Sequence, residues 1–203
     1  MCRRLEQPFA RAAAYGSYEG GLRDLIHLLK YQQVRPAVNV LGRMLAEVIA
    51  GFEPGWADAK ILVVPVPLFA GKLRQRGFNQ AELIARAALK LSSAGAQLLL
   101  EPHLLERTRE TQSQIGLTRH QRRENLRGAF RVTDSRKVSE REILLVDDVF
   151  TTGTTASECA RVLRRAGASR VWVATVARTL KHEVQAVSFR PDEESTLAMA
   201  AHG

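Results

Sequence analysis

The chain has 203 residues, of which 45% are hydrophobic and 25% charged, and its formal net charge at pH 7 is +9. This composition is typical of one globular domain with a small appendage, and it excludes wholesale disorder and collagen-like fibres. The longest apolar stretch, residues 61–70, is too short for a membrane helix, so no membrane insertion is expected. No signal peptide is visible at the start of the sequence, which makes the cytoplasm the expected location.

The first half of the chain predicts helices around one buried strand. Apolar residues recur with helical spacing in residues 21–31 and again in residues 40–50. The continuous apolar run at residues 61–64 predicts a strand that is covered on both faces. A loop with prolines and glycines is expected after it, then a helix capped by Asn79, and then a strand at residues 97–100.

The second half predicts a strand-helix-strand unit after a polar segment. Residues 105–127 form a long stretch rich in arginine. Residues 143–146 predict a strongly apolar strand, residues 154–166 a helix that ends before Gly167, and residues 171–176 a further strand. Strands that alternate with helices indicate an α/β fold with a central, mostly parallel sheet flanked by helices. Ligands bind at the carboxyl ends of the strands in such sheets.

The junction after residues 143–146 carries the most informative chemistry. The predicted strand leads into Asp147 and Asp148, and then into a turn around Gly153. Four hydroxyl residues surround that glycine: Thr151, Thr152, Thr154 and Thr155. A glycine turn at a helix start is suited to binding phosphate, whereas the carboxylates accept hydrogen bonds from sugar hydroxyls or bind Mg²⁺. The predicted ligand is a sugar phosphate with a divalent metal; the alternative is that the two acids merely end a strand.

This junction resembles the phosphoribosyl pyrophosphate (PRPP) loop of the type I phosphoribosyltransferases, in which an apolar run and two acids precede Thr-Gly and a hydroxyl residue. The resemblance implies that Asp147 and Asp148 are the catalytic acids, near the ribose hydroxyls and a Mg²⁺ ion that they bind directly or through water. It also implies a site for the 5-phosphate, formed by Thr151, Thr152, Gly153, Thr154 and Thr155. Salvage enzymes for 6-oxopurines carry Asp where this chain has Thr151, so hypoxanthine or guanine salvage is disfavoured.

Three cations, Lys72, Arg74 and Arg76, follow the strand at residues 61–64. Positive charge at the carboxyl end of a central strand would stabilise departing pyrophosphate, and type I enzymes use the equivalent loop for this purpose. The alternative is a solvated loop without a ligand.

The arginine-rich segment contains a second group of candidates. The family resemblance implies a lid that includes Arg107 and Arg109 and closes over PRPP, excluding water. A salt-bridged helix is the alternative for the second half of the segment, residues 118–127.

Within the type I proteins, the chain is identified as a member of the ComF family of competence-associated, amidophosphoribosyltransferase-like proteins. The matching pieces lie at residues 11–15, 25–31, 65–67, 76–80, 105–109, 111–112, 122–126 and the PRPP loop. Typical members begin with a four-cysteine zinc module, of which Cys2 resembles the last cysteine. Either the module is absent or the start of the chain is assigned too late. One thiol cannot hold zinc alone, so no zinc is expected; Cys159 is expected to be a buried apolar residue.

These resemblances imply a division into three parts. Residues 1–58 are expected to form an N-terminal helical or hood segment with a remnant of the zinc module. Residues 59–180 would form the phosphoribosyltransferase core, and residues 181–203 a flexible tail.

Two functions are implied. The first is a Mg²⁺-dependent transfer of the phosphoribosyl group of PRPP to an acceptor, linked to DNA uptake. The second is a single-stranded DNA-binding competence factor that uses the same basic loops and works beside a helicase-like partner. Only 6% of the residues are aromatic, and Phe69, Phe78 and Phe130 are the candidates for stacking on bases. An RNA-binding regulator on the same fold is a third interpretation.

Overall fold

A parallel five-stranded sheet forms the centre of the molecule. The computed structural model describes residues 7–32, 34–56, 60–92, 94–111 and 118–179. The strand order is β1-β7-β6-β2-β3, and every neighbouring pair is parallel. The strands are β1 (Arg11–Ser17), β2 (Ile61–Pro65), β3 (Leu98–Leu100), β6 (Glu142–Phe150) and β7 (Arg170–Arg178). The parallel α/β architecture predicted from the sequence is therefore confirmed.

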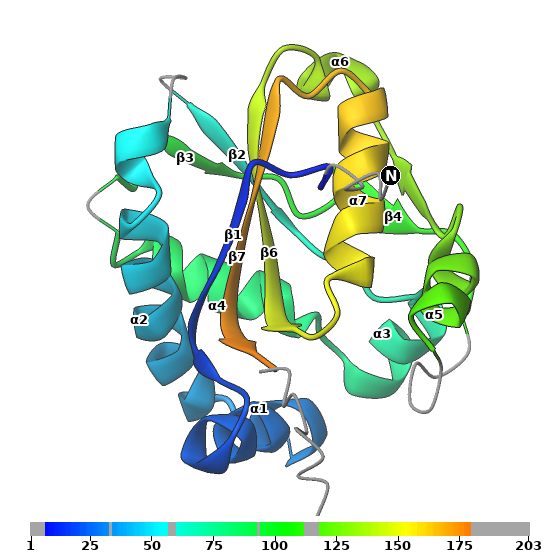
Figure 1. The fold of residues 1–203 in the computed structure, drawn as a ribbon. Helices are drawn as coiled ribbons and strands as arrows, with labels where there is room; N and C mark the ends of the chain where they lie inside the picture. The colour runs from blue at the N-terminus through cyan, green and yellow to red at the C-terminus, as the bar shows by residue number, and fades with distance from the viewer. Residues whose placement is uncertain (1–6, 33, 57–59, 93, 112–117, 180–203) are drawn as a thin grey trace, which may run out of the picture.

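Helices cover both faces of this sheet (Figure 1). One face carries α1 (Gly20–Gln32), α2 (Pro36–Ala50) and α4 (Gln80–Leu89), and a 3₁₀ turn follows α2 at Glu53–Gly55. The other face carries α7 (Thr154–Arg165), with α5 (Arg119–Leu126), α6 (Ser135–Val138) and an antiparallel pair of strands, β4 (Leu105–Arg107) and β5 (Phe130–Val132). Helix α3 (Ala70–Arg76) follows β2.

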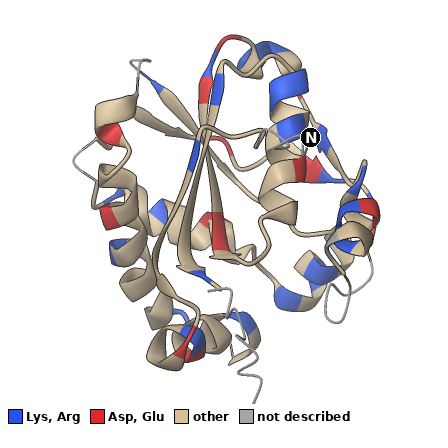
Figure 2. Cartoon of the chain, viewed as in Figure 1, with Lys and Arg blue, Asp and Glu red and all other residues tan. Residues whose placement is uncertain are grey.

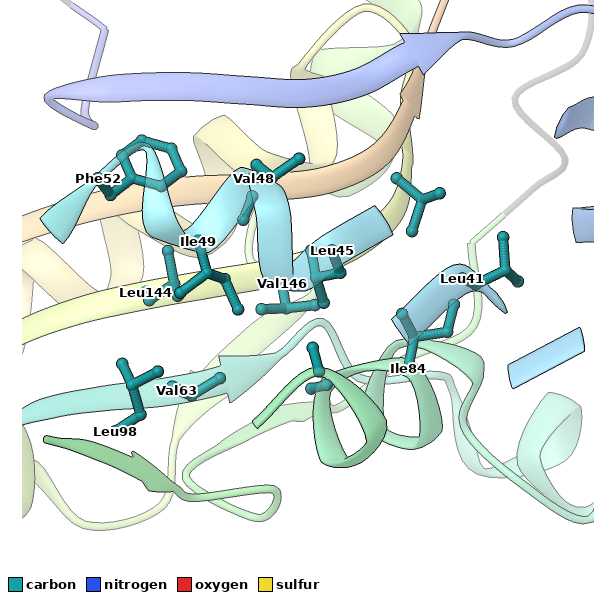
Figure 3. Packing of buried hydrophobic residues seen from close by; sticks show 14 of the residues in the cluster. Leu41, Leu45, Val48, Ile49, Phe52, Val63, Ile84, Leu98, Leu144 and Val146 are labelled. Atoms are coloured by element: carbon teal, nitrogen blue, oxygen red, sulfur yellow. The ribbon is translucent and has the colours of Figure 1, made fainter. Parts of the chain in front are cut away.

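Side chains of the central strands alternate between two apolar clusters, because successive residues of a strand face opposite sides of the sheet. Ile61 and Val63 of β2 pack into the cluster under α1, α2 and α4, which Figure 3 shows from close by. Leu62 and Val64 pack into the cluster under α7. Burial on both faces explains why the strand reads as a continuous apolar run.

Helices α2 and α4 cross closely at a glycine. A Cβ atom built on Gly42 would lie 2.5 Å from the Cβ of Ala87 and 3.2 Å from its carbonyl carbon. Two small residues thus let the two helix backbones approach each other over the sheet, and both helices contribute buried residues to the same cluster.

Three local predictions differ from the structure. The chain between β2 and α4 was expected to be a loop, but it contains α3, which ends at Gly77 in the left-handed conformation with φ 77°. This glycine is a helix C-cap and not a loop residue. Strand β6 continues to Phe150, so the two acids lie within the strand, and β1 joins the sheet although no strand was predicted there. Its alanine-rich sequence carries little strand propensity.

Other predictions lie outside the described residues. These include Cys2, Gln112 and the tail at residues 181–203. The helix predicted for the second half of the arginine-rich segment is confirmed as α5. Thr118 and Gln121 form a capping box at its N-terminus. Cys159 is fully buried, as expected. Among the described residues, no helix is long and apolar enough to cross a membrane.

Candidate functional site

The two predicted acids lie on the middle strand of the sheet, near its carboxyl end. Asp147 pairs in register with Thr175 of β7. The side chain of Asp148 is only 12% exposed, and its backbone N–H donates a hydrogen bond of 2.9 Å to Oδ1 of Asp147. The two acids are thus consecutive on the strand, and a backbone hydrogen bond links them in a partly buried place.

A lysine from helix α1 neutralises part of this charge. Nζ of Lys30 lies 2.7 Å from Oδ2 of Asp148, and the lysine side chain is 18% exposed. Figure 1 shows α1 near the carboxyl ends of β6 and β7. Sequence reasoning did not assign a function to Lys30; its only signal was its place in the run at residues 25–31 that resembles the ComF family.

The pKa values of these groups follow from burial and from their neighbours. Burial and the charge of Asp148 raise the pKa of Asp147 to about 7, against the opposing effects of Lys30, the Asp148 N–H and Arg107. Burial alone would lower the pKa of Lys30, but the contact with Asp148 outweighs this effect and raises it.

The predicted phosphate loop lies next to the acids. Gly153 has φ 72° and caps the N-terminus of α7, and a Cβ atom on it would lie 2.5 Å from Cζ of Phe150. The hydroxyls of Thr152 and Thr154 are 2.8 Å apart. A small hollow lies between this loop and the neighbouring strands. It is lined by Asp147, Val149, Phe150, Thr151, Gly153, Thr155, Ala156 and Thr175. The structure therefore brings one predicted acid and the predicted phosphate loop to one place.

The three basic residues after β2 lie on α3, where they do not share one direction. Lys72 and Arg74 are exposed, and they are two positions apart on the helix, so they face different sides. Arg76 is less exposed, and its guanidinium carbon lies 5.5 Å from the ring centroid of Tyr31. Lys72 and Arg76, four positions apart, lie on one side of the helix, with Arg76 beside α1, and Arg74 lies on another side.

The two arginines of the predicted lid are held by specific contacts. Arg107 is half-buried on β4 with its guanidinium carbon 5.6 Å from the ring centroid of Phe130, and it hydrogen bonds to Thr111. Its Nε is buried and has no hydrogen-bond partner among the described residues. Arg109 donates to the backbone carbonyls of Asn125 and Arg127, at 3.0 and 2.8 Å. Arg109 thus ties the start of this segment to the end of α5.

The aromatic residues predicted for base stacking differ in exposure. Phe130 is 5% exposed, and Phe69 and Phe78 are only partly exposed. Tyr31, at 67% exposure, is instead the most exposed large hydrophobic residue among those described.

The carboxylate pair is suited to magnesium but not to a metal held by protein groups alone. Among the described residues, no group of three or more His, Cys, Asp or Glu could hold a metal ion. Mg²⁺ is commonly bound by one or two carboxylates together with substrate phosphates and water. Asp147 and Asp148 fit such a donor set, provided that a ligand supplies further oxygens.

Comparisons with known proteins place this geometry in a family. The family model for the phosphoribosyl transferase domain matches residues 88–189. The chain is 33% identical over 180 residues to the DNA utilization protein YhgH of Escherichia coli K12, covering 88% of this chain and 77% of that protein. It is 30% identical over 186 residues to competence protein F of Haemophilus influenzae, covering 87% and 76%.

A solved structure is also similar. It is the glutamine PRPP amidotransferase from B. subtilis, with 23% identity and a TM-score of 0.40, covering 70% of this chain and 26% of that one. The domain match includes Asp147, Asp148 and the loop around Gly153, and the two curated relatives extend over most of the chain. The chain therefore belongs to the phosphoribosyltransferase domain family and, within it, to the ComF group of competence-associated proteins.

Proposed function

We propose that the protein binds PRPP together with Mg²⁺ and transfers its phosphoribosyl group to an acceptor, with release of pyrophosphate. The observation that carries the proposal is the hollow shared by Asp147, Thr151, Gly153 and Thr155. A carboxylate on a strand and a glycine loop at a helix N-terminus are the two features needed to hold a sugar and its phosphate side by side.

Each part of the site has a role in this proposal. The backbone N–H groups of the loop and the N-terminus of α7 would hold the 5-phosphate. Asp147 and Asp148 would accept hydrogen bonds from the ribose hydroxyls and hold Mg²⁺, which would screen the charge of the pyrophosphate.

The reaction breaks the bond between C1 of the ribose and the pyrophosphate oxygen. The pyrophosphate leaves with the bonding electrons, the sugar passes through an oxocarbenium-like state, and the acceptor then bonds to C1. Lys72, Arg74 and Arg76 are candidates to stabilise the departing anion. The segment with Arg107 and Arg109 is the candidate to exclude water from the cation.

Calorimetry with PRPP, with and without Mg²⁺, tests the proposal. The double variant Asp147→Asn/Asp148→Asn should bind PRPP with Mg²⁺ at least about tenfold more weakly than wild type. Asp24→Asn is the matched control, because this carboxylate is exposed on α1 and pairs with Arg23. If the double variant and wild type respond identically, the PRPP assignment is wrong.

A second candidate function is binding of single-stranded DNA. Lys and Arg are frequent on α3 and α5, on one side of the molecule (Figure 2), and Lys72 and Arg74 are exposed there. The relatives' names, DNA utilization protein and competence protein, also support a link to DNA. We place this activity in the cytoplasm, beside a helicase-like partner.

Oligonucleotide binding at several salt concentrations tests this second function. Phosphate contacts make log K fall with log salt by about 0.7 per contact for single strands, so Lys72→Gln/Arg74→Gln should lower the slope by about 1.4. The control is Arg136→Gln/Arg165→Gln, which removes two cations from α6 and the end of α7. An equal slope in both variants would show that Lys72 and Arg74 do not contact the DNA, and no binding near physiological salt would remove the DNA function.

A further inference from the structure

Lys30 contacts Asp148, one of the two acids that are proposed to bind Mg²⁺. Its ammonium lies 2.7 Å from Oδ2 of Asp148, and both side chains are largely buried. Among the described residues, Asp148 is the carboxylate that pairs with Lys30 at ion-pair distance. A positive charge therefore lies directly against this carboxylate.

The position of Lys30 is fixed by the packing of α1. Ile26 and Leu29, on the same helix, are each 1% exposed and anchor α1 in the core. Nε2 of His27 and the hydroxyl of Tyr18 are 2.9 Å apart, which joins α1 to the segment that follows β1. The lysine stem thus starts from a rigid base, and its ammonium reaches Asp148 because the fold places it there.

We infer that Lys30 is a tethered counter-ion that occupies the cation position at Asp148 until an anionic ligand draws it away. This inference rests on the proposed sugar-phosphate site. A divalent cation that approaches Asp148 alone meets an oxygen already paired with an ammonium, and the two cations repel each other. The carboxylate pair should therefore bind a divalent cation weakly when no phosphate is present.

A phosphate group in the site reverses this balance. The lysine stem is flexible and its ammonium has three donors, so in this inference the ammonium passes from the carboxylate to a phosphate oxygen. Asp148 then becomes available to the divalent cation, and the ammonium contributes to binding of the anion. The site is thereby selective for a metal and an anion that arrive together.

Binding of Mn²⁺ alone, followed by electron paramagnetic resonance, tests the inference without any turnover. Lys30→Gln should bind Mn²⁺ about tenfold more tightly than wild type. Lys30→Arg keeps the charge and should bind as weakly as wild type, and Lys30→Gln/Asp148→Asn should lose the gain. Equal affinity in wild type and Lys30→Gln would overturn the inference.

A measurement on the wild-type protein covers the case in which Lys30→Gln does not fold. The ¹⁵Nζ resonance of Lys30, assigned by its loss in Lys30→Arg, should move when ribose 5-phosphate and Mg²⁺ are added together. If both ligands bind but this resonance stays in place, the ion pair persists and only the inference is wrong. If neither ribose 5-phosphate nor Mn²⁺ binds to wild type or to Lys30→Gln, the proposed sugar-phosphate site is wrong as well.

Discussion

Lys30 and Asp148 form an ion pair of 2.7 Å between helix α1 and the middle strand of the sheet. Apolar contacts hold α1 against the core, but they do not by themselves orient a polar group toward one carboxylate. The pair does so, and it makes the N-terminal segment part of the candidate site.

Removal of the ammonium should destabilise the fold. Lys30→Met leaves a largely buried carboxylate without its partner, and the expected loss in the free energy of unfolding is about 3 kcal/mol. Urea denaturation of Lys30→Met, Asp148→Asn and the double variant measures the coupling. The double variant should recover part of the loss, since neither charge is then left alone; a loss below about 1 kcal/mol in Lys30→Met would contradict the prediction.

Stability should depend on pH through Asp147. Its pKa is raised from 3.8 to about 7 in the folded protein, so the folded state holds this proton more tightly than the unfolded chain does. As pH rises from about 4 to about 7, this group therefore lowers the free energy of unfolding. Asp147→Asn should remove that decline, so its stability relative to wild type should grow over the same range. Denaturation curves at several pH values without divalent cations check this; a difference that does not change with pH would contradict it.

Gly153 should tolerate no side chain. Gly153→Ala places a Cβ where φ is 72° and where Phe150 lies within 2.5 Å, and the left-handed backbone alone should cost about 1–2 kcal/mol. PRPP affinity should fall too, because the loop must shift. Gly71→Ala is the control, since its Cβ would meet only ordinary contacts of 3.5 Å with Phe69. Thermal unfolding and calorimetry measure both variants, and equal behaviour of the two would show that the loop geometry is not needed.

The crossing of α2 and α4 should be equally sensitive to one methyl group. Gly42→Ala inserts a Cβ at 2.5 Å from the Cβ of Ala87, with the α4 backbone directly behind, and it should cost about 1–3 kcal/mol by overpacking. Gly21→Ala is the control, because nothing lies within 4 Å of its Cβ in the first turn of α1; it should be neutral or slightly stabilising. Chemical denaturation distinguishes the two.

The parts of the site that lie together in the chain were predictable. The strand, the acids, the glycine turn and α7 are consecutive, and each carries a local signal such as an apolar run or a residue suited to positive φ. Asn79 was also identified as a cap, and its side chain accepts a hydrogen bond from the Ala81 N–H at 3.0 Å. Such features depend on a few neighbouring residues, so a sequence contains most of what determines them.

Features that depend on distant partners were missed. Strand β1 gains its structure from β7, and its own residues, among them Ala12, Ala13 and Ala14, carry little strand propensity. The sequence of α3 predicts a loop because Gly71 and Gly77 flank its cations. The contact of Lys30 with Asp148 depends on where α1 lies over the sheet, which no local pattern records.

The pairing of β1 with β7 has a consequence for synthesis of the protein on the ribosome. The earliest strand of the sheet, Arg11–Ser17, has its only described strand partner in Arg170–Arg178, the last described strand. Nascent chains emerge from the ribosome amino end first. The backbone of β1 therefore has no strand partner until almost all of the described chain has been translated. Pairing of β1 with the sheet therefore comes late in synthesis of the described residues, and chaperone contact with the nascent chain is expected at this unpaired strand.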